Sequence, residues 1–146
     1  MTPVFRKINA NDQALFLAMS DEFYHSPAVL HDIDASFHQR TFDELMRSDE
    51  YADCYIIEAD GAAAGYALLA KTFSREAGGI VVWIEELYLR PAYQGQGLGS
   101  SFFHWIEQQL PAARYRLEVE PENVRAARLY ERLGYSVLPY RQMIKE

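Results

Sequence analysis

Two adjacent carboxylates lie in the middle of the most apolar stretch of the chain. Glu85 and Glu86 interrupt the run IVVWIEELYLR, residues 80–90, whose β-branched and aromatic residues predict a central strand. A carboxylate inside such a strand is costly unless it has a partner or a task, and a common task is proton transfer. Because side chains alternate along a strand, at most one of the two should face a given site. The other interpretation is one exposed and one salt-bridged carboxylate.

Three glycines at alternate positions follow this strand. The segment YQGQGLGSS, residues 93–101, carries Gly95, Gly97 and Gly99 at the start of a predicted helix. Such a loop exposes successive backbone N–H groups at the positive end of a helix, an arrangement that binds phosphate. It is not the dinucleotide fingerprint, which would need glycine at Ser100, and it lacks the GKS or GKT ending of a P-loop. Taken alone, the loop could equally be a turn that only reverses the chain.

The elements that must position these residues form one domain, residues 1–146. The cluster 9–12 can cap a first helix, Thr41 with Glu44 forms a capping box for a second, and the Asp-Gly pair at 60–61 predicts a β-hairpin. Strand patterns cover residues 4–8, 53–59, 62–73, 80–90, 115–120 and 135–145, helical patterns cover residues 13–26, 41–48, 100–110 and 123–134, and residues 28–40 are ambiguous. The order β-α-α-β-β-β-α-β-α-β predicts an α/β (α+β) fold.

Composition excludes several classes of function. The 146 residues are 49% hydrophobic and have a net charge of −7, so the chain can build a core but repels a nucleic-acid backbone. The single cysteine, Cys54, allows no internal disulfide, and no histidine pair has the spacing of a helical metal site. No run approaches the roughly 20 apolar residues of a membrane span, and the first residues lack a secretory pattern. We therefore expect a cytoplasmic protein without metal, nucleic-acid or membrane partners.

Three motifs between Ile80 and Tyr135 point to a known family. They are EELYLRPAYQGQGLGSSFF, with a QxxGxG signature at Gln94, Gly97 and Gly99, then LEVEPEN, and finally NVRAARLYERLGY. Together they resemble the GNAT superfamily of acetyl-CoA-dependent N-acetyltransferases, whose element order the chain also shares. The resemblance implies a GNAT-like mixed, mostly antiparallel central sheet and an acetyl-CoA cosubstrate, although the first half of the chain matches in element order alone.

The resemblance also implies where acetyl-CoA binds, between the strands over residues 80–90 and 115–120. The thioester arm would lie along the backbone of Leu87, Tyr88 and Leu89 like an added strand. The loop would wrap the pyrophosphate with Gln94, Gly95, Gln96, Gly97, Leu98, Gly99 and Ser100, and the next helix would contribute Asn123, Ala126 and Tyr130. Many members carry Arg or Lys where this chain has two glutamines, so affinity here would depend more on Arg90, Arg125, Arg128 or Arg132.

Acetyl transfer to an amine needs a base, an oxyanion donor and an acid. Glu85 matches the strand glutamate that relatives use as general base, although a β-bulge would exchange it with Glu86. Tyr130 is the expected general acid for the departing thiolate, and its other interpretation is a core aromatic. A main-chain N–H near Leu87 or Tyr88 would hold the oxyanion.

Charge is distributed unevenly and bears on the acceptor. Residues 10–61 hold twelve acidic and two basic residues, a net charge of −10, whereas residues 111–146 have a net charge of +2. In the family the first two helices shape the acceptor pocket, so an acidic rim there would attract a cationic amine. The expected acceptor contacts are Tyr24, His25 and Glu85, and the acidic candidates around them are Asp21, Glu22, Asp32 and Asp34.

These observations predict an N-acetyltransferase that moves the acetyl group of acetyl-CoA to a primary amine of a cationic small molecule, by direct attack in a ternary complex. A peptide or protein amine is the alternative acceptor. A noncatalytic acyl-CoA-binding or sensing module is the alternative function on the same fold, and an unrelated nucleotide binder ranks last. The 14% share of aromatic residues would also allow the apolar interface of a homodimer.

Overall fold

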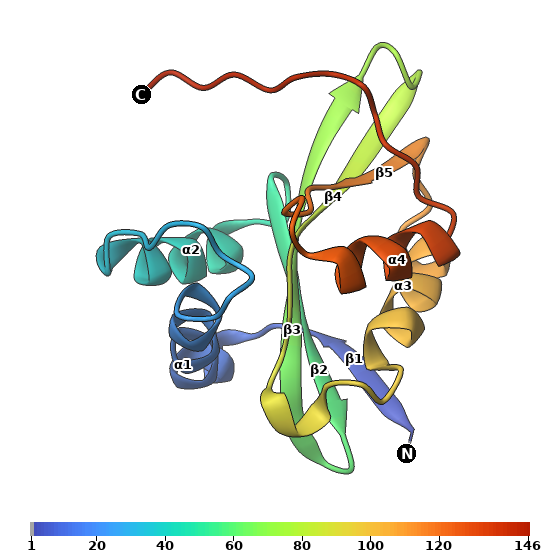
Figure 1. Ribbon diagram of the computed structural model, residues 1–146. Helices are drawn as coiled ribbons and strands as arrows, with labels where there is room; N and C mark the ends of the chain where they lie inside the picture. Colours follow the sequence, from blue (N-terminus) through green and yellow to red (C-terminus); the bar gives the residue numbers. More distant parts are fainter. Residues whose placement is uncertain (1) are drawn as a thin grey trace.

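A five-stranded sheet forms the centre of the molecule. The computed structural model describes residues 2–146 and orders the strands β1-β2-β3-β4-β5, all antiparallel except for the parallel pair β4 and β5 (Figure 1). The strands are β1 Pro3–Lys7, β2 Ala52–Ala59, β3 Ala62–Ser74, β4 Gly79–Leu89 and β5 Arg114–Leu117. The mixed, mostly antiparallel sheet is therefore confirmed, and β4, which carries both carboxylates, lies between β3 and β5.

Helices cover both faces of this sheet. They are α1 Gln13–Tyr24, α2 Ser36–Arg47, α3 Leu98–Gln109 and α4 Val124–Arg132, with 3-10 turns at Ala10–Asp12 and Pro91–Tyr93. Figure 1 shows α1 and α2 on one face and α3 and α4 on the other. Each face has its own core, because Phe16 and Met19 of α1 pack with Tyr66, whereas Phe102 and Phe103 of α3 belong to a second cluster. Apolar burial on both faces makes the central strands the most rigid support for a site.

Local sequence explains the 3-10 turn before α1 and the turn between β2 and β3. The Asn9 side chain accepts a hydrogen bond from the Asn11 N–H, and the Asp12 carboxylate accepts one from the Asn9 N–H. The predicted cluster therefore caps the 3-10 turn Ala10–Asp12 that leads into α1, whereas α1 itself has no side-chain cap at Asp12. Asp60 and Gly61 have φ of 53° and 78°, as a two-residue hairpin turn requires.

The second helix begins earlier than the predicted capping box. α2 starts at Ser36, whose N–H and hydroxyl both donate to the Asp34 carboxylate at 2.9 and 2.6 Å. The Thr41 hydroxyl instead donates to the Phe37 carbonyl one turn back, inside the helix. The prediction of a start at Thr41 was therefore wrong, because Asp34 in the ambiguous segment already satisfies the helix start.

The predicted last strand is absent from the described residues. Residues 135–146 form neither helix nor strand. Val137, Met143 and Ile144 are 89%, 92% and 84% exposed, so the apolar pattern that predicted a strand is not buried in this chain. A strand is stabilised by a neighbour that pairs with its backbone, and β5 pairs only with β4. The fold class holds, but the order of elements ends at α4.

Candidate functional site

The parallel pair of β4 and β5 separates halfway along β4. The pairing runs from Val81 to Ile84 and ends there, although β4 continues to Leu89. The second half of β4 therefore has an open edge on the β5 side. This is where the family resemblance predicts the thioester arm.

Backbone groups on that edge can be assigned from the hydrogen bonds of the opposite edge. The Arg90 N–H donates to the Ala64 carbonyl, and the Tyr88 carbonyl faces β3 so closely that a Cβ on Gly65 would clash with it. Because backbone groups alternate in direction along a strand, those of Leu87 and Leu89 point into the gap. The predicted contact through the Tyr88 backbone is therefore not placed at the open edge, whereas those of its two neighbours are.

The glycine loop leaves backbone donors free at the start of α3. Gly95 and Gly97 have φ of 74° and 79°, a region in which other residues are strained. No side chain caps the helix, so the N–H groups of Leu98, Gly99 and Ser100 have no acceptor within it. These donors and the helix dipole make the loop a candidate anion site.

The two glutamines of the loop brace it from within. The Gln94 side chain donates to the Leu89 carbonyl at 2.9 Å, and the Gln96 side chain donates to the Ala92 carbonyl at 3.0 Å. Both amides are therefore used to fix the loop against the end of β4. Any cationic contact to a phosphate must come from another element.

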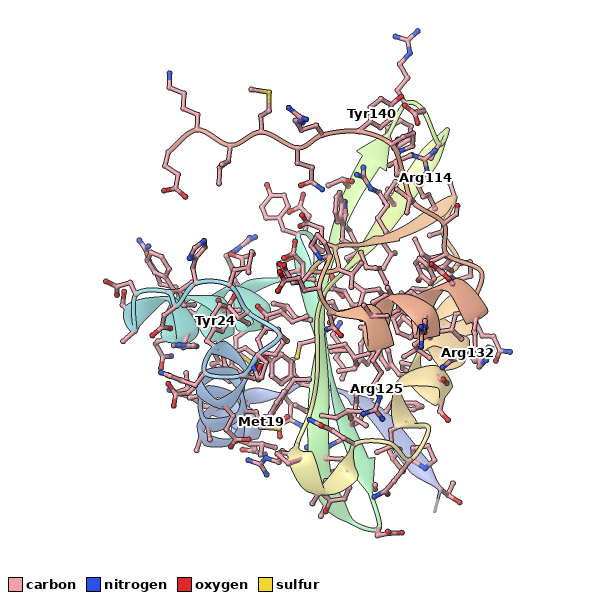
Figure 2. The ribbon with its side chains drawn as sticks, in the orientation of Figure 1. Met19, Tyr24, Arg114, Arg125, Arg132 and Tyr140 are labelled. Carbon is pink, nitrogen blue, oxygen red and sulfur yellow. The ribbon has the colours of Figure 1, made fainter. Side chains whose placement is uncertain are left out.

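One arginine from α4 approaches this loop. A Cβ placed on Gly95 would lie 3.5 Å from a terminal nitrogen of Arg125. Figure 2 shows Arg125 below α4 on the side of the loop, with Arg132 further along the helix and pointing outwards. Arg90 is instead paired with Glu22, with an N–O distance of 3.2 Å. Of the basic residues considered from the sequence, Arg125 is placed to meet a phosphate at the loop.

Asn123 and Ala126 have a structural task in α4. The Asn123 side-chain oxygen accepts a hydrogen bond from the Ala126 N–H at 3.2 Å and so caps the helix. This cap fixes the start of the helix that carries Tyr130. The place of Asn123 at the start of the family-like motif therefore has a local structural cause, because its side chain caps α4.

Tyr130 is both a packing residue and a possible proton donor. Its half-buried ring lies edge-on against Phe103 and tilted against Tyr135, with centroid distances of 5.7 and 6.2 Å. Burial raises the pKa of Tyr130, so the phenol stays protonated at neutral pH. The residue also lines a groove beside β5. The two interpretations drawn from the sequence are thus compatible.

Glu85 and Glu86 line the same pocket, on the face covered by α1 and α2. Leu68 of β3 lies opposite Glu86 but Leu69 lies opposite Ile84, so Glu85 is an extra residue in β4. This bulge interrupts the alternation of side chains, and the expectation that the two carboxylates face opposite sides was therefore wrong. The pocket has a volume of about 490 Å³, and its other walls are Tyr24, Ile33, Phe37, Arg40, Thr41, Glu44, Ala52 and Leu68.

The two carboxylates differ in their partners. Tyr24 and Tyr66 donate to the two oxygens of Glu86 at 2.9 and 2.7 Å. Burial raises the pKa of Glu86, and the two phenol hydrogen bonds oppose part of that rise. Glu85 is more exposed, but desolvation, with the nearby Glu86 and Glu118, raises the pKa of its carboxyl too.

A buried histidine beside this cluster was not singled out from the sequence. His38 is 8% exposed, its Nδ1 lies 2.5 Å from Ser20 Oγ, and its ring lies edge-on to Tyr24 at 5.5 Å. The i, i+4, i+7 spacing of His38, Phe42 and Leu45, all buried, is the signal that could have placed it on the inner face of α2.

The predicted acidic rim does not line the pocket, because none of Asp21, Glu22, Asp32 and Asp34 is among its walls. His25 is exposed, with ring nitrogens 3.5 and 3.7 Å from carboxylate oxygens of Asp21 and Asp32, and it is not a wall of the pocket. Tyr24 and Glu85 are the predicted acceptor contacts that do line it. The negative charge of the pocket therefore comes mainly from β4 rather than from the loop after α1.

A sequence model of the acetyltransferase (GNAT) family matches residues 14–135. The chain belongs to this family. It is 29% identical over 108 residues to uncharacterised N-acetyltransferases of Mycobacterium bovis and Mycobacterium tuberculosis, a match that covers 72% of this chain and 65% of those relatives. The chain thus spans less than two thirds of the length of these curated relatives.

Solved acetyltransferases share the fold. A possible acetyltransferase from Clostridium difficile 630 has a TM-score of 0.83 at 16% identity, covering 100% of this chain and 98% of that one. The aminoglycoside N-acetyltransferase AAC(6')-Iy, solved with CoA, has a TM-score of 0.75 at 16% identity, covering 99% and 95%. The family is therefore the acetyltransferase (GNAT) family and the fold is that of solved acetyltransferases, which confirms the resemblance seen in the motifs.

Two further findings concern the described residues 2–146. None of their helices is long and apolar enough to cross a membrane. Across the same residues, no three His, Cys, Asp or Glu side chains gather in a way that could hold a metal ion.

Proposed function

We propose that this chain is an N-acetyltransferase that transfers the acetyl group of acetyl-CoA to a primary amine of a cationic small molecule. The observation that carries the proposal is the gap beyond Ile84, where β4 and β5 part. It opens between the carboxylate pocket on one face of the sheet and the groove that contains Tyr130 on the other. An amine in the pocket and a thioester in the gap would meet, which allows direct attack in a ternary complex.

The residues around the gap fit acetyl-CoA. When bound, the cosubstrate supplies an activated acetyl group. The Leu87 carbonyl and the Leu89 N–H can pair with its amide arm, and the Leu87 N–H is the candidate oxyanion donor. Gly95 and Gly97 leave the start of α3 open to the pyrophosphate, and Arg125 adds a positive charge beside them.

The two carboxylates would divide the work on the amine. Glu86 is fixed by two phenols and is suited to anchor the ammonium group. Glu85 lacks such hydrogen bonds among the described residues, and its raised pKa makes it a better base once it is ionised. Tyr130, kept protonated by burial, would give a proton to the departing thiolate.

The charge of the pocket supports a cationic acceptor. Glu44 is paired with Arg47 at 2.7 Å, whereas Glu85 and Glu86 have no cationic partner among the described residues. Arg40 also lines this pocket, so its wall is not uniformly acidic. The groups that would attract a cationic amine are therefore the two carboxylates of β4. The structural neighbour AAC(6')-Iy is named an aminoglycoside N-acetyltransferase, and aminoglycosides are small molecules with several amines.

A thiol-release assay with acetyl-CoA tests the acceptor class. The panel contains polyamines, aminoglycosides, amino acids, basic peptides, and neutral and acidic amines. We expect turnover with small cationic amines. Turnover of neutral or acidic acceptors alone would overturn the proposed class, and a strong preference for peptides would favour the peptide alternative.

Two variants separate an enzyme from a noncatalytic acyl-CoA-binding module. Tyr130→Phe and Glu85→Gln should each lower kcat by about 100-fold or more, the usual contribution of general acid–base catalysis. Acetyl-CoA should still raise the Tm of both variants, because each change alters a single polar group, while the glycine loop and Arg125 still hold the pyrophosphate. Tyr51→Phe, at a tyrosine that is 62% exposed and not a wall of the pocket, is the matched control. Stabilisation by acetyl-CoA without thiol release from any acceptor would favour the sensing module.

A further inference from the structure

One face of α2 forms a wall of the pocket that contains the two carboxylates of β4. Four residues of the helix line this pocket, at the i, i+3, i+4 and i+7 spacing of a single stripe: Phe37, Arg40, Thr41 and Glu44. The helix lies beside the sheet on the same face as α1 (Figure 1), so the stripe and the carboxylates belong to different elements. A ligand in the pocket would therefore meet charged groups from both α2 and β4.

The guanidinium of Arg40 is not neutralised by a neighbouring acid. Among the described residues 2–146, no ion pair joins it to an acidic side chain. The pKa of Asp34, just before the helix, is lowered first by two hydrogen bonds from Ser36 and least by the charge of Arg40. This carboxylate is therefore engaged with Ser36, and the charge of Arg40 is available to a ligand.

The ring of Phe37 supports this guanidinium. The Arg40 Cζ atom lies over the ring, 5.5 Å from its centroid, and both residues line the pocket. Stacking on a ring uses a face of the guanidinium and leaves the N–H groups in its plane free. Those groups can donate two parallel hydrogen bonds to a carboxylate. Arg40 is therefore suited to bind a carboxylate of the ligand.

The charges of the pocket define the charges of a ligand that would complement it. Glu44 accepts two hydrogen bonds from Arg47, at 2.9 and 2.7 Å, so its charge is already balanced. Two negative charges on β4 and the positive charge of Arg40 remain. A ligand with two ammonium groups and one carboxylate would match all three. The pocket volume of about 490 Å³ lies in the range of small-molecule sites.

We propose that the acceptor is a diamino monocarboxylic acid, whose carboxylate binds Arg40 while its two amines meet the two carboxylates of β4. Glu86 would hold the ammonium group that does not react, and Glu85 would serve the one that does. Such a ligand has a net charge of +1, so it is one kind of the cationic acceptor proposed above, and the inference rests on that proposed function. Arg40 would then be the residue that selects amines with a carboxylate.

The transfer to this acceptor uses the groups already described. The reacting ammonium gives one proton to Glu85, its nitrogen bonds to the acetyl carbon, and the carbon–sulfur bond breaks with its electron pair going to sulfur. Tyr130 protonates the sulfur and regains a proton from the second one that the nitrogen loses. The proton on Glu85 leaves to water, and the products are CoA and an N-acetylated diamino acid.

Calorimetry tests the carboxylate contact without reference to turnover. Lysine is compared with cadaverine and ornithine with putrescine, with and without CoA, because each diamine is the amino acid without its carboxylate. At least one amino acid should bind about tenfold more tightly than its diamine, the low end for a charge-assisted pair because Arg40 is exposed. Lysinamide, which lacks the negative charge, should bind like cadaverine. Equal or tighter binding of both diamines would overturn the proposal.

A pair of variants assigns the preference to Arg40. Arg40→Gln should weaken the binding of the preferred amino acid about tenfold. It should strengthen the binding of the matching diamine, because the guanidinium no longer repels the second ammonium group, and this gain shows that the pocket is still folded. Arg75→Gln, at an exposed arginine of the β3–β4 hairpin that lines neither pocket, is the matched control and should keep the wild-type preference. An Arg40→Gln protein that still prefers the amino acid would overturn the assignment.

Thiol release separates this inference from the proposed function. Turnover of diamines that exceeds turnover of both diamino acids would leave the acetyltransferase standing and overturn the carboxylate contact. Selective binding of a diamino acid without thiol release from any acceptor would support the contact and contradict the enzyme.

Discussion

Replacing Tyr24 by phenylalanine tests how the pocket sets the charge of Glu86. Tyr24 donates to one oxygen of this carboxylate at 2.9 Å and Tyr66 donates to the other at 2.7 Å. Both hydrogen bonds favour the ionised form, so removing one must raise the pKa of Glu86 further. A hydrogen bond to a charged group contributes about 1.5–3 kcal/mol. Because Tyr24 and Glu86 are only half-buried, we expect the lost hydrogen bond to contribute about 1 kcal/mol, which corresponds to a rise of about 0.7 in the pKa of Glu86.

Titration of the side-chain carboxyl carbons by NMR measures this shift directly, with the Glu86 signal assigned by its loss in Glu86→Gln. Tyr88→Phe is the matched control, because that hydroxyl donates to Glu22 and not to Glu86. An unchanged Glu86 pKa in Tyr24→Phe, or an equal rise in the control, would refute the reasoning.

The same variant should change the pH profile of acetyl transfer. If Glu86 anchors the ammonium group as proposed, kcat/KM is high above its pKa and is lost as the pH falls through it. Raising that pKa therefore moves the acidic limb of the profile to higher pH. If the pKa of Glu86 shifts but the pH profile of acetyl transfer does not change, Glu86 does not anchor the acceptor. Its hydrogen bonds to the tyrosines would still be confirmed.

Three further outcomes follow from the loop, from α4 and from the 3-10 turn before α1. Gly97→Ala, at φ of 79°, should lower the unfolding free energy by about 1 kcal/mol and raise the KM for acetyl-CoA. Gly78→Ala, at φ of 75° in a distant hairpin, should lower the unfolding free energy without changing this KM. Chemical denaturation and kinetic assays measure the two effects. Arg125→Gln should weaken CoA binding about tenfold in calorimetry, most strongly at low salt, whereas Arg132→Gln should leave it unchanged. Asp12→Asn should lower the unfolding free energy at neutral pH by about 2 kcal/mol, because it removes the charge that pairs with Arg6 and one of the two oxygens that accept from Arg6 and from the Asn9 N–H. The Arg6 hydrogen bond lowers the pKa of Asp12, so this contribution is present above the ordinary aspartate pKa and is lost as the pH falls through the lowered value; urea titrations of wild type and variant should converge at strongly acidic pH.

Features that depend on a few neighbouring residues could be predicted from the sequence. The hairpin turn at Asp60 and Gly61, the Asn123 cap and the glycine loop all follow from local backbone requirements, such as a positive φ or an unsatisfied N–H. The apolar run around Glu85 predicted the strand because burial on both faces selects such residues. Family motifs lie in these same segments, so they too were visible in the sequence.

Only the tertiary structure decided how distant segments meet. The bulge that turns Glu85 and Glu86 into one pocket depends on the register against β3, which no local pattern of β4 specifies. The phenols that hold Glu86 come from α1 and β3, so its partners depend on how the helix packs on the sheet. The tail after α4 shows the opposite case. Its residues have the sequence pattern of a strand, but a strand also needs a neighbour that pairs with its backbone. In the described residues the tail pairs with no strand, and the outer edge of β5 is left open.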